Sequence, residues 1–165
     1  MTESPFRIPI QDLAEPGSRR EIEIDAEVDW GFELAEVGPT LHADLRLENA
    51  AGVLVVRGRV ESVLGLTCHR CLTEWDEEVD LPVTEALGFE EDEEAEVYRL
   101  DGDVADLEPV LRDVVLLEVP LRPLCREDCR GLCATCGADL NGGPHPEHEE
   151  ESSSPFAVLR DLLEP

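Results

Sequence analysis

Six cysteines lie in two groups that are widely separated along this 165-residue chain. The first group is the short motif Cys68-His-Arg-Cys71. The second group contains the other four, which are Cys125, Cys129, Cys133 and Cys136. A Cys-x2-Cys turn holds two sulfurs about one metal tetrahedron apart, and two such groups joined by a folded segment can build a zinc site of four thiolates. We therefore interpret the cysteines as metal ligands.

Six cysteines exceed one tetrahedral site, so their distribution stays open. One arrangement has a first site of Cys68, Cys71, Cys125 and Cys129. The remaining donors then make a second, weaker site of Cys133, Cys136, His145 and His148. The other arrangement is a ribbon-like quartet of Cys68, Cys71, Cys133 and Cys136. His145 and His148 can also be polar linker residues, and we interpret His42 and His69 as surface residues.

Other chemistries of clustered cysteines fit this chain less well. The spacing Cys129-x3-Cys133-x2-Cys136 is that of a radical iron–sulfur site, but those enzymes need a barrel larger than this chain. A redox Cys-x2-Cys belongs at the start of a helix in a βαβ unit, whereas Cys68 and Cys71 lie between expected strands. The order of His145-Pro-Glu147 and the last two cysteines is the reverse of that in zinc deaminases. Four thiolates around one metal ion leave no coordination position for a substrate. We therefore expect that the protein is not an enzyme and has no small-molecule substrate.

The charge of the chain restricts its partners. It has 40 acidic and 13 basic residues, with a formal net charge of -27. Such a chain repels nucleic acid as a whole and favours basic partners. Four arginines nevertheless lie within or beside the cysteine groups, and they are Arg70, Arg122, Arg126 and Arg130. They either balance the negative charge of a zinc–thiolate centre or contact RNA phosphates, and Arg57 and Arg59 can extend such a contact.

The chain shows no targeting signal that we recognise. Prolines at positions 5, 9 and 16 interrupt the first 17 residues, which contain no apolar run. No stretch approaches the roughly 20 apolar residues of a membrane span. We therefore expect a cytoplasmic protein without a membrane partner, in a compartment where thiols stay reduced.

Alternating apolar and polar residues predict a sheet. Strands are expected over 21–29, 40–49, 53–67 and 74–84, with a bulge at Gly58 and an extended segment before residue 20. Several such segments in series predict an antiparallel sheet, curved or partly closed like a barrel. The acidic run 90–96 reads as a solvated loop.

One long helix is predicted over residues 106–118, with Asp106 as its cap and Pro120 after its end. Its apolar stripe consists of Leu107, Val110, Leu111, Val114 and Leu117. A single domain is expected over 1–140, a flexible linker over 141–154 and a docking helix over 155–165. The fold class is therefore α+β, with a Cys-rich metal-binding loop and a short C-terminal helix.

The chain resembles the YceD-like family, the large ribosomal RNA subunit accumulation proteins. The motifs that carry the resemblance are LTCHRCL at 66–72, DLEPVLRDVVLLEVPLRPLC at 106–125, CREDCRGLCATCGADLN at 125–141 and SPFAVLRDLL at 154–163. Together with the strand-rich first half, they cover nearly the whole chain. The Cys-rich stretch, with Gly-Leu-Cys-x2-Cys-Gly-x2-Leu-Asn, is the most specific of them.

The resemblance implies a ribosome biogenesis factor that supports accumulation or processing of 23S ribosomal RNA in large-subunit assembly. Its expected partners are pre-ribosomal 23S RNA, a basic large-subunit ribosomal protein, or both. It also favours the first arrangement of cysteines, with zinc in a structural role, because ligand-type residues persist at those four positions in the family. The alternative function is an acidic, chaperone-like module that shields a basic ribosomal protein without contacting RNA.

Overall fold

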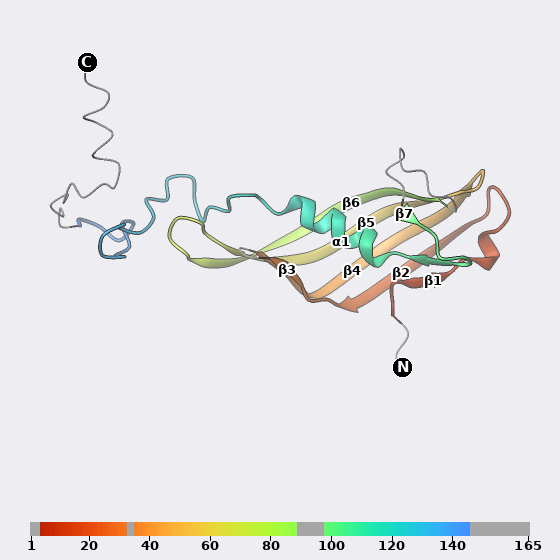
Figure 1. The fold of residues 1–165 in the computed structure, drawn as a ribbon, viewed down its shortest axis with the longest axis horizontal. Coiled ribbons are helices and arrows are strands. Elements are labelled where there is room, and N and C mark those ends of the chain that lie inside the picture. Colours follow the sequence, from red (N-terminus) through yellow and green to blue (C-terminus); the bar gives the residue numbers. More distant parts are fainter. Residues whose placement is uncertain (1–3, 33–34, 89–97, 146–165) are drawn as a thin grey trace, which may run out of the picture.

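The computed structural model describes residues 4–32, 35–88 and 98–145 (Figure 1). Within these ranges the elements are β1 (Arg7–Pro9), η1 (Gln11–Leu13), β2 (Arg19–Glu27), β3 (Trp30–Phe32), β4 (Ala35–Ala50), β5 (Val53–Thr67), β6 (Glu74–Gly88), β7 (Tyr98–Arg99), β8 (Val104–Asp106) and α1 (Glu108–Glu118). The acidic run 90–96 and the helix predicted over 155–165 lie outside the described residues. No helix within the described ranges has the length and apolar character needed to cross a membrane.

The main sheet has the strand order β2-β4-β5-β6-β7, and β3 pairs with the start of β4. The pairs β2–β4, β4–β5 and β5–β6 are antiparallel, and the short β6–β7 pair is parallel. β1 and β8 form a separate two-stranded sheet. The predicted antiparallel sheet is therefore confirmed, but it is open. The prediction of a partial barrel was wrong, because β2 and β7 lie at opposite edges of the sheet and do not pair.

Three long strands form the body of the molecule. β5 has the bounds that its β-branched sequence predicts, while β4 and β6 extend beyond the predicted 40–49 and 74–84. β4 turns into β5 through Ala51 and Gly52, which both have positive φ (57° and 95°), as expected of a tight hairpin turn. The result is an elongated shape, with the Cys-rich segment at the end opposite this turn (Figure 1).

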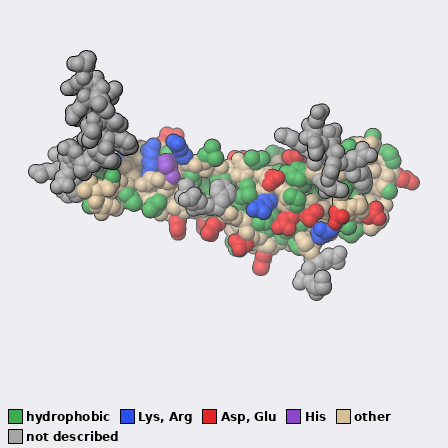
Figure 2. Space-filling model, in the orientation of Figure 1, with side chains coloured by type: hydrophobic (Ala, Val, Ile, Leu, Met, Phe, Trp, Pro, Cys, Tyr) green, Lys and Arg blue, Asp and Glu red, His purple; other side chains and the backbone are tan. Residues whose placement is uncertain are grey.

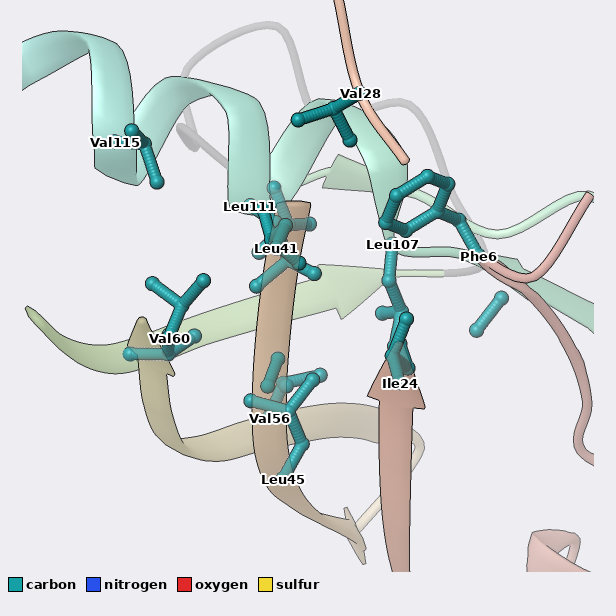
Figure 3. Close-up of a cluster of buried hydrophobic side chains, with 14 of the residues drawn as sticks. Phe6, Ile24, Val28, Leu41, Leu45, Val56, Val60, Leu107, Leu111 and Val115 are labelled. Carbon is teal, nitrogen blue, oxygen red and sulfur yellow. The ribbon is translucent and has the colours of Figure 1, made fainter. Parts of the chain in front are cut away.

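The helix α1 lies across one face of the sheet (Figure 1). Leu107, Leu111 and Val115 are fully buried and point toward sheet residues such as Leu41 and Val60 (Figure 3). The face of the sheet that meets the helix is apolar because inward residues alternate with polar outward ones along β4 and β5. The predicted helix is thus confirmed as a covering layer of the core.

Three details of the sequence prediction need correction. Leu117 is 86% exposed, because it lies at the margin of the apolar stripe, which continues through Val115 instead. The helix cap is Leu107, although Asp106 still accepts a hydrogen bond from the backbone N–H of Glu108 at 3.1 Å. The N-terminal segment is more than an extended leader, since Phe6 is buried against Trp30, with ring centroids 5.9 Å apart.

Gly58 has a different role from the predicted bulge. The pairing of β4 with β5 is regular from Leu41 to Ala50, and its one register shift lies between Val37 and Leu41. A Cβ atom at Gly58 would overlap the backbone carbonyl of Asp44 on the neighbouring strand. Gly58 is therefore required by the close approach of two backbones in the middle of the sheet.

We predict that Gly58→Ala destabilises the protein by about 1–3 kcal/mol, because the added methyl group must push β4 and β5 apart. The matched control is Gly65→Ala in the same strand, where the new Cβ would contact Asp76 Oδ1 at an ordinary 3.7 Å. Urea unfolding of both variants measures the effect. A Gly58→Ala protein as stable as Gly65→Ala would contradict the explanation.

Candidate metal centre

The first two cysteines lie in the turn that joins β5 to β6. The backbone N–H of Cys68 donates to Thr73 O at 2.9 Å, and the N–H of Leu72 donates to Cys68 O at 2.9 Å. Leu72 adopts φ 59° to close this turn. The sheet itself therefore sets the position of the Cys68–Cys71 pair at one end of the molecule.

The segment after α1 returns to this turn and brings Cys125 and Cys129 with it. The N–H of His69 donates to Pro123 O at 3.0 Å, which fixes the segment beside the turn. Arg70 Nη1 donates to Cys129 O at 2.8 Å. Two backbone-directed contacts thus hold the second pair of cysteines against the first.

The four sulfurs converge within one coordination sphere. Sγ atoms of Cys68, Cys71, Cys125 and Cys129 all lie within 4.8 Å of one another. The Cys68–Cys129 separation is 3.8 Å and the Cys71–Cys125 separation is 3.5 Å. A zinc ion with four Zn–S bonds of about 2.3 Å separates its sulfurs by about 3.8 Å. The group can therefore bind a tetrahedral metal ion, whereas a disulfide needs sulfurs about 2.05 Å apart.

The thiols of this quartet differ in their affinity for protons. Burial disfavours the Cys68 thiolate, but hydrogen bonds from the backbone of Cys125, Cys71 and Arg70 outweigh burial and lower the pKa of Cys68 to about 6. Two effects raise the pKa of Cys125 to about 12. The first is loss of solvent around its sulfur, and the second is hydrogen bonding with the neighbouring thiols. Clustered thiolates repel one another, and a bound cation removes that repulsion.

The last two cysteines belong to a different group. Cys133, Cys136 and His145 bring two Sγ atoms and one ring nitrogen within 4.8 Å of one another. A hydrogen bond from the His145 ring, helped by backbone N–H groups of Cys136 and Thr135, lowers the pKa of Cys133 to about 6. The geometry separates the cysteines four and two, as in the first of the two predicted arrangements. His148 lies outside the described residues.

Asn141 lies beside the first group. Its Nδ2 donates to Cys129 Sγ at 3.6 Å, and its Oδ1 accepts from the N–H of Arg130 at 2.8 Å. Nearby, the N–H of Leu132 donates to Arg70 O at 3.1 Å. Gly131 permits this approach, since a Cβ there would lie 2.9 Å from Arg70 O. Composition placed Asn141 in the predicted linker 141–154. The sequence Asn-Gly-Gly indicates a turn but gives no sign of a hydrogen bond to a cysteine.

All four predicted arginines lie on the segments of this end and are exposed. Arg70 is held by the Cys129 carbonyl, and Arg126 Nε lies 3.3 Å from Asp128 Oδ1. No carboxylate of the described residues makes an ion pair with Arg122 or Arg130. Figure 2 shows basic side chains gathered beside a histidine near the cysteine-bearing end, whereas acidic side chains predominate over the sheet.

The outer face of the sheet, which points away from α1, is acidic. Register places one row of polar side chains across four strands, and the row is Asp25, His42, Glu61 and Asp80. An open groove of about 790 Å³ lies over this row. His42 Nδ1 lies 2.8 Å from Asp25 Oδ1, and this hydrogen bond raises the pKa of His42. Glu23 completes a third group of donor atoms there, formed by exposed carboxylates and this ring.

The model of the family described as large ribosomal RNA subunit accumulation protein YceD matches residues 56–163. An uncharacterized protein of Mycobacterium tuberculosis is 34% identical over 98% of this chain and 83% of its own length. An uncharacterized protein of Mycobacterium leprae is also 34% identical, over 82% of this chain and 65% of its length.

A named relative comes from maize. The large ribosomal RNA subunit accumulation protein YCED homolog 1, chloroplastic, of Zea mays is 31% identical over 54% of this chain and 42% of its own length. No solved structure matches the chain. The family match includes the β5–β6 turn, α1 and both cysteine groups. Because it covers more than half of the chain, it shows that the chain belongs to the YceD family.

Proposed function

We propose that this chain is a non-catalytic, cytoplasmic factor that supports accumulation or processing of 23S ribosomal RNA during assembly of the large ribosomal subunit. The observation that carries this proposal is the family match over residues 56–163, together with the name of the maize relative. The proposed partners are pre-ribosomal 23S RNA, a basic large-subunit protein, or both.

The RNA contact is assigned to the cysteine-bearing end. Its arginines are exposed, and Arg122 and Arg130 have no carboxylate partner among the described residues that would compete with a phosphate. Arginine binds phosphate through two parallel hydrogen bonds, so such residues suit an RNA backbone. Arg70 is better explained as a structural residue, because its guanidinium is already bonded to the Cys129 carbonyl.

The metal at the first quartet is proposed to be structural zinc. Four thiolates fill the tetrahedron, which leaves no position for a substrate. Cys68 and Cys129 are almost fully buried, with exposed fractions of 0% and 2%. A four-thiolate centre with two buried ligands stabilises the fold, although Cys71 is half-buried and Cys125 is exposed. This supports a non-enzymatic role.

The acidic outer face of the sheet favours a second candidate function. The row from Asp25 to Asp80 crosses four strands and borders an open groove. A basic ribosomal protein segment would be attracted to this face, and RNA would be repelled. In this alternative the chain shields a basic protein and does not touch RNA.

Depletion of the protein in the cells that encode it tests the biological role. We expect 23S precursors to accumulate and mature large subunits to fall relative to small subunits. Re-expression of the wild-type chain is expected to reverse both changes. Northern analysis of 23S ends and sucrose-gradient profiles measure them, and unchanged 23S maturation after depletion would refute the proposal.

The variant Arg122→Ala/Arg130→Ala tests the RNA contact. Each lost phosphate contact lowers the slope of log K against log salt by roughly 1, so the two changes together lower it by roughly 2. We expect weaker binding to 23S RNA and weaker recovery of this RNA with the tagged chain from lysate.

The matched control is Arg19→Ala/Arg46→Ala, which removes the same charge from the outer face of the sheet. It is expected to leave RNA binding and its salt dependence unchanged. Equal losses in both variants would mean that only net charge matters. Recovery of a basic ribosomal protein that resists RNase, with no 23S RNA bound by the purified chain, would favour the shielding alternative.

The variant Cys68→Ser tests the structural zinc. Structural zinc contributes on the order of 10 kcal/mol to the folding of small metal domains, so we expect loss of this metal and a clear fall in melting temperature. Thr67→Ser is the control, because it makes a similar change beside the centre without removing a donor. Elemental analysis and thermal unfolding measure both. Full metal content with an unchanged melting temperature would show that Cys68 is not a ligand.

A further inference from the structure

The second donor group has the geometry of a separate metal site. Cys136 Sγ lies 3.4 Å from His145 Nε2, and Cys133 Sγ belongs to the same group of close donor atoms. Zinc bound at about 2.3 Å to sulfur and about 2.05 Å to nitrogen separates two tetrahedral ligands by about 3.6 Å. One zinc ion therefore fits the thiolates and the imidazole with only small side-chain movements.

Backbone hydrogen bonds build this site independently of the first quartet. The N–H of Gly137 donates to Cys133 O at 2.8 Å, and the N–H of Cys133 donates to Ala138 O at 2.8 Å. Gly137 adopts φ 74°, and Leu132 forms a β-bridge with Asp139. These contacts hold the sulfurs of Cys133 and Cys136 on one side of a closed turn, to which His145 returns.

The two groups differ in exposure and in the number of donors. Cys136 is exposed, and Cys133 and His145 are half-buried, whereas two ligands of the first quartet are almost fully buried. Among the described residues this group offers three donors, against four in the first quartet, and zinc readily binds three protein ligands. A chelator can attack such an ion directly, while an ion enclosed by four thiolates must first lose a ligand.

We infer that Cys133, Cys136 and His145 bind a second zinc ion, in an exposed site that exchanges its metal faster than the Cys68–Cys129 quartet. The chain then carries two zinc ions of different lability. The slow ion joins the sheet to the Cys-rich segment, and the fast ion closes the loop that follows Arg130. This second site is independent of any RNA contact, so its test can fail while the proposed function stands.

The test counts zinc in the purified full-length chain, reduced and loaded with Zn²⁺ alone. We expect two zinc ions per chain, with one released quickly and one slowly to a colorimetric chelator. Cys136→Ser is expected to retain one zinc ion and to lose the fast phase. Thr135→Ser, a change in the same turn that removes no donor, is expected to retain two ions and both phases.

Cobalt substitution gives a second readout. The sulfur-to-cobalt absorption of the chain loaded with Co²⁺ should fall by about one third in Cys136→Ser, because a site with two of the six thiolates is lost. If Cys136→Ser does not fold by circular dichroism, His145→Ala replaces it in both measurements. One zinc ion per wild-type chain, or two in the folded variant, would overturn the second site.

Discussion

Residues 120–145 have little hydrophobic burial to hold them in place. The described apolar core ends at Val119, and beyond it the buried residues in the described part of the chain are Pro123, Cys129 and Gly131. The position of this segment therefore depends on the convergence of two cysteines from the sheet with two from the segment itself. Hydrogen bonds through His69 and Arg70 orient the approach, but each is worth only about 1 kcal/mol. A metal bound by all four sulfurs is the strongest bond available to this end.

That dependence also explains the separation of charge along the molecule. The sheet and helix have an apolar core, so their outer surface can carry a large excess of carboxylates. The cysteine end has almost no core, and a zinc–thiolate centre there would carry net negative charge. Arginines beside it offset this charge, and Arg70 shows how one of them also braces the centre. Arg122 and Arg130 make no ion pair among the described residues, so their guanidinium groups are available to a partner.

The sequence was most informative where one periodicity dominates. β5 was predicted to the residue because its β-branched run is continuous, and α1 was recognised from its apolar stripe and flanking prolines. Pairings between distant segments were missed. β1 pairs with β8 across almost a hundred residues, and the local alternation of Phe6, Ile8 and Ile10 does not identify that distant partner. Gly58 was misread because a close backbone approach and a bulge both favour glycine.

For the candidate site, spacing identified the cysteines as a metal framework but left their grouping open. Spacing alone does not show which distant cysteines share a metal, so Cys125-x3-Cys129 and Cys133-x2-Cys136 are both possible partners of Cys68 and Cys71. Three-dimensional placement decides, because Pro123 docks beside His69 and carries Cys125 with it. The role of Asn141 could not be predicted, because no sequence pattern indicates a side-chain hydrogen bond to a distant cysteine sulfur.

These constraints limit how an RNA partner can approach. The acidic row across β2, β4, β5 and β6 repels a polyanion from the broad face of the sheet. The proposed RNA contact is therefore end-on, at the tip where the cysteines and arginines meet. A basic protein would instead be drawn to the broad face, so the two candidate partners do not compete for the same surface. Metal loss would loosen the tip before the sheet, so the proposed RNA contact is expected to be more sensitive to zinc than the proposed protein contact.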